Sequence, residues 1–226
     1  MGRLLPVIFE PAHAGATART RVVMLPAAFT GPADFVQHGF ARAVRERSLE
    51  VDLVFPGIKL EQVIDRSVFA HLSAEVILPA RALGCTLWIG GISLGGYLAL
   101  GCAERQPREL AGLCLLAPYL GSHLITGEIE RAQGVEGWQP EDAGQDDEER
   151  SVWRFIRTLR TRSLPVHLGL GREDRFVRRQ ELLAAALPPA DVDVISGGHD
   201  WATWRTLWDR FLDLRFRTGS RHGRKA

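Results

Sequence analysis

The chain has 226 residues, of which 46% are hydrophobic and 24% are charged, and its formal net charge is +1. A chain of this length can bury one sizeable core without disulfides or metal ions, and the composition argues against a disordered or fibrous protein. The net charge says little about partners, but the basic clusters are confined to short segments such as residues 160–162 and the last few residues, which argues against a nucleic-acid partner, because such proteins concentrate basic residues on one face.

The cysteines predict a cytoplasmic protein. Cys85, Cys102 and Cys114 are odd in number and stand among apolar neighbours, so we expect buried free thiols in a reducing compartment. The apolar run at the N-terminus is very short and includes Pro6, which makes it a poor signal peptide. No apolar stretch reaches the roughly 18 to 20 residues that span a bilayer, and we therefore expect a soluble protein.

Short apolar runs alternate with longer segments of helical periodicity along most of the chain. The runs that predict strands are residues 21–25, 51–55, 86–89, 113–116, 166–170 and 192–195, with an antiparallel edge strand at 4–9. The segments that predict helices are residues 35–47, 60–83, 94–105, 178–187 and 201–216. This alternation is typical of the α/β class, with a mostly parallel central sheet and helices on both faces.

Residues 121–150 depart from this rhythm. They are rich in Gly, Gln and acids, and they predict a loop or a minimal lid. The acids at the end of this segment are expected to form a solvated face or the first turn of a helix over residues 151–160, where carboxylates favour the helix dipole. Residues 218–226 are polar and predict a flexible tail, so we expect one domain over residues 1–217.

The segment GISLGG, residues 91–96, follows a predicted strand and opens a predicted helix. This is the context of a nucleophile elbow, a sharp turn that presents a serine, here Ser93. Gly91 and Gly95 fit such a turn, because side chains at these positions would collide with the crossing strand and helix. The first amides of the helix point at the reacting centre, so the N–H of Leu94 is predicted to stabilise an oxyanion.

A Gly-x-Ser-x-Gly string alone is weak evidence, because glycine is common enough for the string to occur by chance. The ordinary alternative is a glycine-softened turn between a strand and a helix. An acid and a histidine follow Ser93 in the order that this architecture uses. His199, in the loop after the last predicted strand, is the candidate base, because the carboxyl ends of such strands hold reacting groups and a neutral imidazole can take the serine proton. His123, which follows the strand over residues 113–116, is its rival.

The candidate acid is Asp174, which lies in the turn beyond the penultimate predicted strand. A carboxylate there can hold the second N–H of the histidine and stabilise the imidazolium. Glu173 is the nearest rival, and Asp174 could instead be an ordinary turn acid that caps the next helix. Asp191 and Asp193 are expected to face solvent, and the side chain of Asp200 to point away from the base.

Tryptophans at positions 201, 204 and 208 follow the candidate base at helical spacing. We expect a stripe that anchors the last helix on the sheet, and an aromatic wall beside the histidine is the alternative. Trp88 is expected in the core.

Three segments, GISLGG (91–96), GREDRFV (171–177) and Gly198 with His199, resemble the signature sites of the α/β-hydrolase superfamily. The resemblance covers roughly residues 21–216 and implies the α/β-hydrolase fold with Ser93, Asp174 and His199 as a catalytic triad. The family's usual His-Gly is replaced by Pro-Ala at residues 26–27, so the second oxyanion donor falls on the N–H of Ala28 or, one residue later, of Phe29.

By this resemblance a serine nucleophile excludes epoxide hydrolases and haloalkane dehalogenases, which carry an aspartate there. We expect a serine hydrolase, without metal or other cofactor, that cleaves a small-molecule ester or thioester through an acyl-enzyme. An acyltransferase or carbon–carbon bond hydrolase would use the same residues, and a non-catalytic binding scaffold is the alternative from another class. The short excursion at 121–150 favours a small substrate. The oligomeric state is not indicated.

Overall fold

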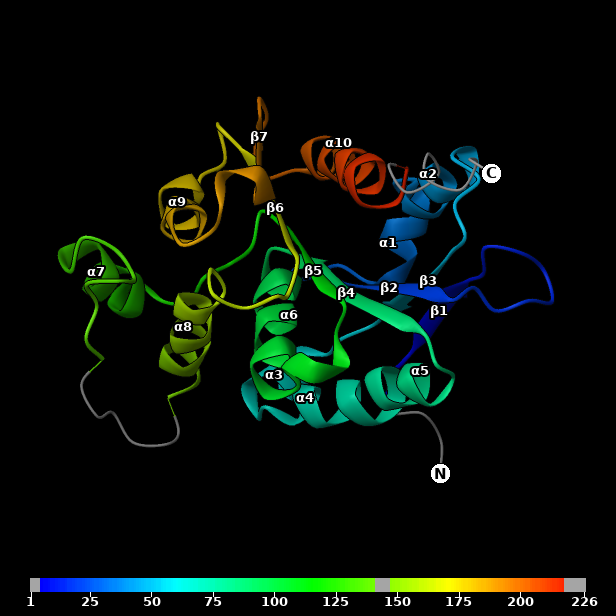
Figure 1. Ribbon diagram of the computed structural model, residues 1–226, viewed down its shortest axis with the longest axis horizontal. Coiled ribbons are helices and arrows are strands. Elements are labelled where there is room, and N and C mark those ends of the chain that lie inside the picture. Colours follow the sequence, from blue (N-terminus) through cyan, green and yellow to red (C-terminus); the bar gives the residue numbers. More distant parts are fainter. Residues whose placement is uncertain (1–4, 141–146, 218–226) are drawn as a thin grey trace, which may run out of the picture.

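The computed structural model describes residues 5–140 and 147–217. A seven-stranded sheet in the order β1-β3-β2-β4-β5-β6-β7 crosses the molecule, with helices on both faces (Figure 1). The strands are β1 (Val7–Glu10), β2 (Thr20–Leu25), β3 (Val51–Pro56), β4 (Thr86–Ile92), β5 (Gly112–Leu116), β6 (Val166–Gly171) and β7 (Val192–Ile195). The predicted fold class is therefore confirmed.

The edge strand β1 runs antiparallel to β3, while the other strands are parallel to their neighbours. It begins at Val7, three residues later than predicted, because Pro6 has no N–H to donate to a strand ladder. The Pro6 carbonyl still accepts a 2.7 Å hydrogen bond from the N–H of Gly57. Pro6 thus bonds to the residue that follows β3, although it precedes β1 and belongs to neither strand.

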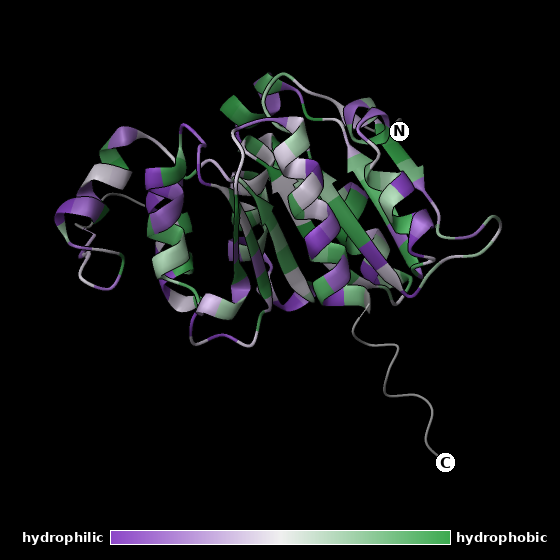
Figure 2. Cartoon of the chain, turned by 90° about the horizontal axis from the view of Figure 1, so that it is seen from above, coloured by the Kyte–Doolittle hydropathy of each residue, from purple (hydrophilic) through white to green (hydrophobic). Residues whose placement is uncertain are grey.

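The central strands are buried on both sides, because helices cover both faces of the sheet. Alternate residues of β2 enter opposite halves of the core: Val23 and Leu25 pack in one cluster, Val22 and Met24 in the other. Figure 2 shows apolar strands inside and hydrophilic helix surfaces outside. The sheet therefore separates two cores. The loops that follow its parallel strands lie at its carboxyl edge.

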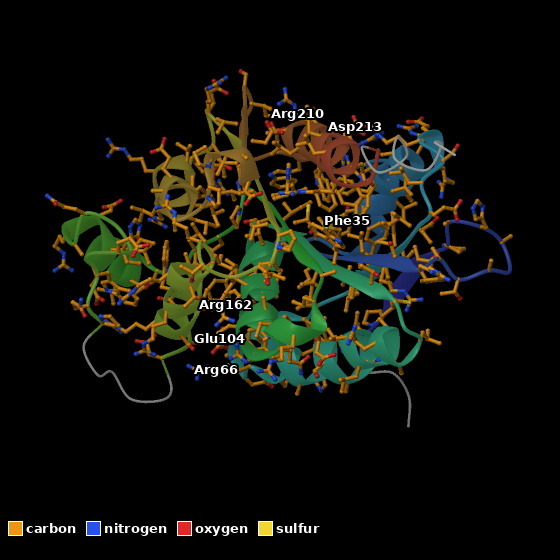
Figure 3. The ribbon with its side chains drawn as sticks, in the orientation of Figure 1. Phe35, Arg66, Glu104, Arg162, Arg210 and Asp213 are labelled. Atoms are coloured by element: carbon orange, nitrogen blue, oxygen red, sulfur yellow. The ribbon has the colours of Figure 1, made fainter. Side chains whose placement is uncertain are left out.

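The helices divide between the two faces. One face carries α1 (Pro32–Gln37), α2 (Phe40–Glu46) and α10 (Trp201–Leu212), which continues into η4 (Asp213–Arg217). Phe35 of α1 lies between these helices and the sheet (Figure 3) and is fully buried. Its ring stacks on that of Phe55 of β3, with centroids 4.8 Å apart. The elements over the other face are α3 (Leu60–Ile64), α4 (Ser67–Leu72), η1 (Ser73–Ile77), α5 (Leu78–Ala82), α6 (Leu94–Arg105), α7 (His123–Arg131), α8 (Glu148–Thr158) and α9 (Val177–Ala185). Short turns η2 (Pro107–Glu109) and η3 (Pro189–Asp191) precede β5 and β7.

Two predicted helices are each divided, and the prediction of continuous segments was wrong there. The segment 35–47 breaks at Gly39, with φ 80°, and the segment 60–83 breaks at Arg66, with φ 62°. Residues in the left-handed region cannot continue a right-handed helix. Hydrophobic periodicity persists through such a break, which is why the sequence pattern does not reveal it.

Residues 121–150 contain α7 and the start of α8. Asp147 caps α8 by accepting a 3.0 Å hydrogen bond from the N–H of Arg150, and Glu148 and Glu149 occupy the first turn. Of the two interpretations of the acidic run, the helix start is therefore confirmed. Residues 141–146 and the predicted tail, residues 218–226, lie outside the described residues, and the single-domain boundaries remain a prediction.

The cysteines are buried and free, as expected. Across residues 5–140 and 147–217, no helix combines the length and apolarity needed to cross a bilayer.

Candidate active site

Ser93 lies on the turn between β4 and α6, with φ 52° and ψ −115°. A positive φ is strained for a residue other than glycine and is typical of functional turns. Backbone hydrogen bonds hold it: the N–H of Ser93 donates to the carbonyl of Leu116 at 3.1 Å, and its carbonyl accepts from the N–H of Tyr119 at 2.9 Å. The strained serine is thus tied to the end of β5, and its side chain is only half-buried.

The glycines beside this turn are required by crowding. A Cβ added at Gly91 would lie 2.3 Å from the carbonyl carbon of Gly95, and a Cβ at Gly95 would lie 2.1 Å from the carbonyl oxygen of Leu25. Both contacts are with backbone, which cannot give way. The close approach expected of these two glycines is therefore present.

A hydrogen-bonded chain joins Ser93, His199 and Asp174. The Nε2 atom of His199 lies 3.0 Å from Oγ of Ser93, and its Nδ1 lies 2.7 Å from Oδ2 of Asp174. The three residues follow the carboxyl ends of β4, β7 and β6. Because an ionised carboxylate can only accept, Nδ1 carries a proton and donates it, which leaves Nε2 free to accept the serine proton.

Asp174 is buried among donors. Besides His199, Oδ1 accepts from the N–H of Phe176 at 2.8 Å, and Oδ2 accepts from the side-chain amide of Gln180 at 3.2 Å. Burial by itself would raise the pKa of Asp174, but the hydrogen bonds from His199 and Phe176 outweigh it and hold the pKa below its usual value. The carboxylate is therefore charged at neutral pH and can stabilise an imidazolium.

Two aromatic rings fix the plane of the imidazole. Phe176 and Trp204 each meet the ring of His199 edge-on, with centroids 5.0 Å away. Trp208 is fully buried instead, and its Nε1 donates to the carbonyl of Phe40 at 3.1 Å. The tryptophan stripe thus anchors α10 and also provides one wall beside the histidine. The sequence does not indicate this role of Phe176, which lies two residues after Asp174 in the GREDRFV segment.

The rival residues have other partners. The carboxylate of Glu173 accepts from the N–H of Gly197 and from Oγ of Ser196, so it binds the histidine loop rather than the imidazole. Asp200 caps α10 through the N–H of Thr203, at 2.9 Å. His123 is exposed at the start of α7 and contacts Arg179.

The remaining acids lie on the last strand and just before it, paired with arginines that follow the histidine loop. Asp193 forms a 2.6 Å ion pair with Arg210, and Asp191 a 2.7 Å pair with Arg215. The two acids were expected to face solvent. Both are instead partly buried, because these arginines cover them.

The predicted oxyanion donors lie on two adjacent segments. Ala28 and Phe29 follow β2, and Leu94 is the first residue of α6. In the part of the chain that the structure describes, no protein acceptor binds the backbone N–H of Ala28, Phe29 or Leu94. All three are available to a ligand. Phe29 has φ 62° and its side chain is 98% exposed.

A small apolar cavity of about 40 Å³ opens beside these donors. Its lining includes Ala28, Phe29, Ile58, Val63, Leu94 and Leu98. The cavity is small and its lining is mostly apolar, so it suits a short apolar group better than a long chain. The described residues contain no cluster of three or more His, Cys, Asp or Glu side chains that could hold a metal ion.

The chain has the fold of the α/β hydrolases: a mostly parallel sheet with a serine after β4, an acid after β6 and a histidine after β7. No family model matches the sequence. A ferulic acid esterase superposes with a TM-score of 0.61 at 12% identity, over 94% of this chain and 98% of the other. S-formylglutathione hydrolase (FrmB) of Staphylococcus aureus gives 0.58 at 14% identity, over 89% and 84%. These likenesses establish the fold.

One sequence relative is an acetyl esterase of Caldicellulosiruptor saccharolyticus. It is 28% identical over 131 residues, which make up 52% of this chain and 49% of the relative. The chain therefore spans about half the length of the curated relative that it matches.

Proposed function

We propose that the protein is a serine hydrolase of the esterase type, which cleaves a small carboxylic ester or thioester. The observation that carries this proposal is the hydrogen-bonded chain from Ser93 through His199 to the buried Asp174. A nucleophile, a base and an orienting acid in that order are the parts that acyl transfer needs. The esterase and hydrolase names of the compared proteins also support it.

In the proposed reaction, Oγ of Ser93 attacks the carbonyl carbon while Nε2 of His199 takes the hydroxyl proton. Asp174 stabilises the imidazolium, and the N–H groups of Ala28 and Leu94 stabilise the negative oxygen of the tetrahedral intermediate. His199 then gives its proton to the leaving alcohol or thiol. Water, activated by the same imidazole, hydrolyses the acyl-serine and restores the free enzyme.

We propose that the substrate carries a short acyl group. With the carbonyl oxygen held by Ala28 and Leu94, the acyl chain enters the small apolar cavity that these residues line, which supports a short acyl group. The acetyl esterase relative agrees with this size. Acyltransferases use the same residues, but no feature of the site favours an acceptor other than water.

A fluorophosphonate probe tests the proposal. It reacts with a serine only when a neighbouring base activates the hydroxyl, so we expect stoichiometric labelling of the peptide that contains Ser93, located by mass spectrometry. Unlabelled, folded protein would instead indicate a binding scaffold. We further propose a cytoplasmic location, supported by three free thiols; cell fractionation with an antibody against the protein tests it.

A further inference from the structure

Arginines cluster in the segment after β6 that carries Asp174, whereas the apolar cavity lies beside β2 and α6. Residues 172–179 contain four arginines. The guanidinium of Arg175 lies 4.8 Å from the ring centre of Phe176, and that ring lies 5.0 Å from the imidazole of His199. Arg175 and His199 therefore contact the same aromatic ring. Arg175 is exposed, so its charge is open to a ligand.

A second cation approaches from α9. Arg179 contacts the ring of His123, the first residue of α7, where the two helices lie side by side (Figure 1). Burial and the charge of Glu149 raise the pKa of Tyr119, whereas the positive charge of Arg179 opposes them. Arg179 is thus near the phenol of Tyr119, whose backbone N–H binds the carbonyl of Ser93.

These two cations have no acidic partner among residues 5–140 and 147–217: no carboxylate there lies within ion-pair distance of Arg175 or Arg179. The acids in the same region are engaged elsewhere. Asp174 is buried against His199, Glu173 holds the loop at Gly197, and Glu149 accepts from the N–H and hydroxyl of Ser122. Among the described residues, no carboxylate therefore neutralises these two arginines, and an anionic ligand can do so.

The chemistry of the site decides which part of the substrate meets that charge. The leaving oxygen or sulfur must receive its proton from Nε2 of His199, so the leaving group lies on the histidine side, where Phe176 contacts the imidazole and Arg175 contacts Phe176. Resting on the function proposed above, we infer that the leaving group carries an oxyanion, a carboxylate or a phosphate, that Arg175 and Arg179 bind. Guanidinium groups suit both anions because they donate in a planar fork.

Matched esters with one acyl group test this inference. The substrates are 4-acetoxybenzoate and 4-acetoxyphenyl phosphate, which are anionic, and 4-acetoxybenzamide, which is neutral. We measure kcat/KM for each with the wild type, Arg175→Gln, Arg179→Gln and the double variant. The control is Arg108→Gln, in η2 at the opposite end of the sheet. Because intrinsic ester reactivities differ, the readout is the anionic-to-neutral ratio in each protein.

We expect the double variant to lower that ratio about tenfold, chiefly through KM, and Arg108→Gln to leave it unchanged. Raising the ionic strength from 50 mM to 500 mM should reduce the ratio in the wild type only, since salt screens exposed charges. A larger loss for the phosphate or for the benzoate identifies which oxyanion the arginines prefer.

An unchanged ratio in the double variant overturns the inference, provided that the neutral ester is still hydrolysed in a Ser93-dependent way. Absence of hydrolysis of every ester, together with absence of fluorophosphonate labelling, would instead reject the proposed function. The two failures are thereby distinguishable.

Discussion

Nε2 of His199 lies 3.0 Å from Oγ of Ser93, although 106 positions of the chain separate the two residues. Two strands, β5 and β6, stand between the strands that carry them. The loop after β7 must therefore reach back across the carboxyl edge of the sheet. The Glu173 carboxylate holds this loop at Gly197, and Phe176 and Trp204 fix the ring at its end. The contact depends on the whole sheet being assembled.

Ser93→Ala is expected to lower hydrolysis of p-nitrophenyl acetate by at least about 10³-fold, because it removes the hydroxyl on which the proposed acyl-enzyme forms. The fold should be retained, since the change deletes only Oγ and leaves the backbone hydrogen bonds to Leu116 and Tyr119 in place. Steady-state rates and thermal melting of purified protein check both points. A variant that keeps more than a tenth of the wild-type rate would show that Ser93 is not the nucleophile.

Asp174→Asn is expected to lower kcat by about 10⁴-fold, the loss known for this change in a serine-protease triad. An amide donates as well as accepts, so it can hold His199 in the wrong tautomer, and it cannot stabilise the imidazolium. Stopped-flow or steady-state assays at pH 7 measure the effect.

Two neighbouring acids serve as controls for that change. Asp193→Asn breaks a pair with Arg210 away from the imidazole and should alter kcat less than twofold. Glu173→Gln weakens the hold on Gly197 and should cost less than tenfold. A loss in Glu173→Gln equal to that of Asp174→Asn would contradict the assignment of Asp174 alone as the triad acid and would favour Glu173.

Val63→Ala should broaden the acyl range, because it removes two methyl groups from the wall of the small cavity. We expect kcat/KM for the butyrate ester to rise about three- to tenfold relative to the acetate ester, as one or two methylenes in an apolar pocket change binding by about 1 to 3 kcal/mol. The matched control, Leu83→Ala, is exposed just after α5, far from the carboxyl edge. Parallel chain-length profiles for all three proteins would place the acyl group elsewhere.

His167 is predicted to make the fold sensitive to acid. It is buried in β6, its Nε2 has no hydrogen-bond partner among the described atoms, and burial lowers its pKa to about 4. The unfolded chain binds a proton below about pH 6.5, whereas the folded chain does so only near 4. Unfolding therefore takes up a proton in this window, and stability falls as the pH falls, by about 3 kcal/mol at pH 4.

Urea unfolding between pH 7 and pH 4.5 tests this effect. His167→Gln cannot titrate, so its unfolding free energy should fall less steeply with acid than that of the wild type, whatever the cost of the substitution at pH 7. His71→Gln, on α4, serves as the control and should follow the wild-type slope. Equal slopes for His167→Gln and the wild type would contradict the burial argument.

Local patterns predicted most of the architecture because each strand carries its own apolar signal. Every residue of β5 and β6 is buried, and the corresponding runs were recognised from composition alone. The breaks at Gly39 and Arg66 were missed, because the apolar spacing continues through both positions and carries no information on φ. The helix α7 was missed for a related reason: its segment is polar and gains stability from packing beside α9.

The sequence by itself determined which residues are candidates, since the GISLGG turn, the acid after β6 and the histidine after β7 are each readable from their place at a strand end. Only the tertiary structure decided among them: it brings Asp174, and not Glu173, to Nδ1 of His199. It also places Phe176 against the imidazole and Arg175 over the ring of Phe176. Neighbouring side chains on a turn diverge, and which one faces the histidine depends on contacts between segments distant in the chain.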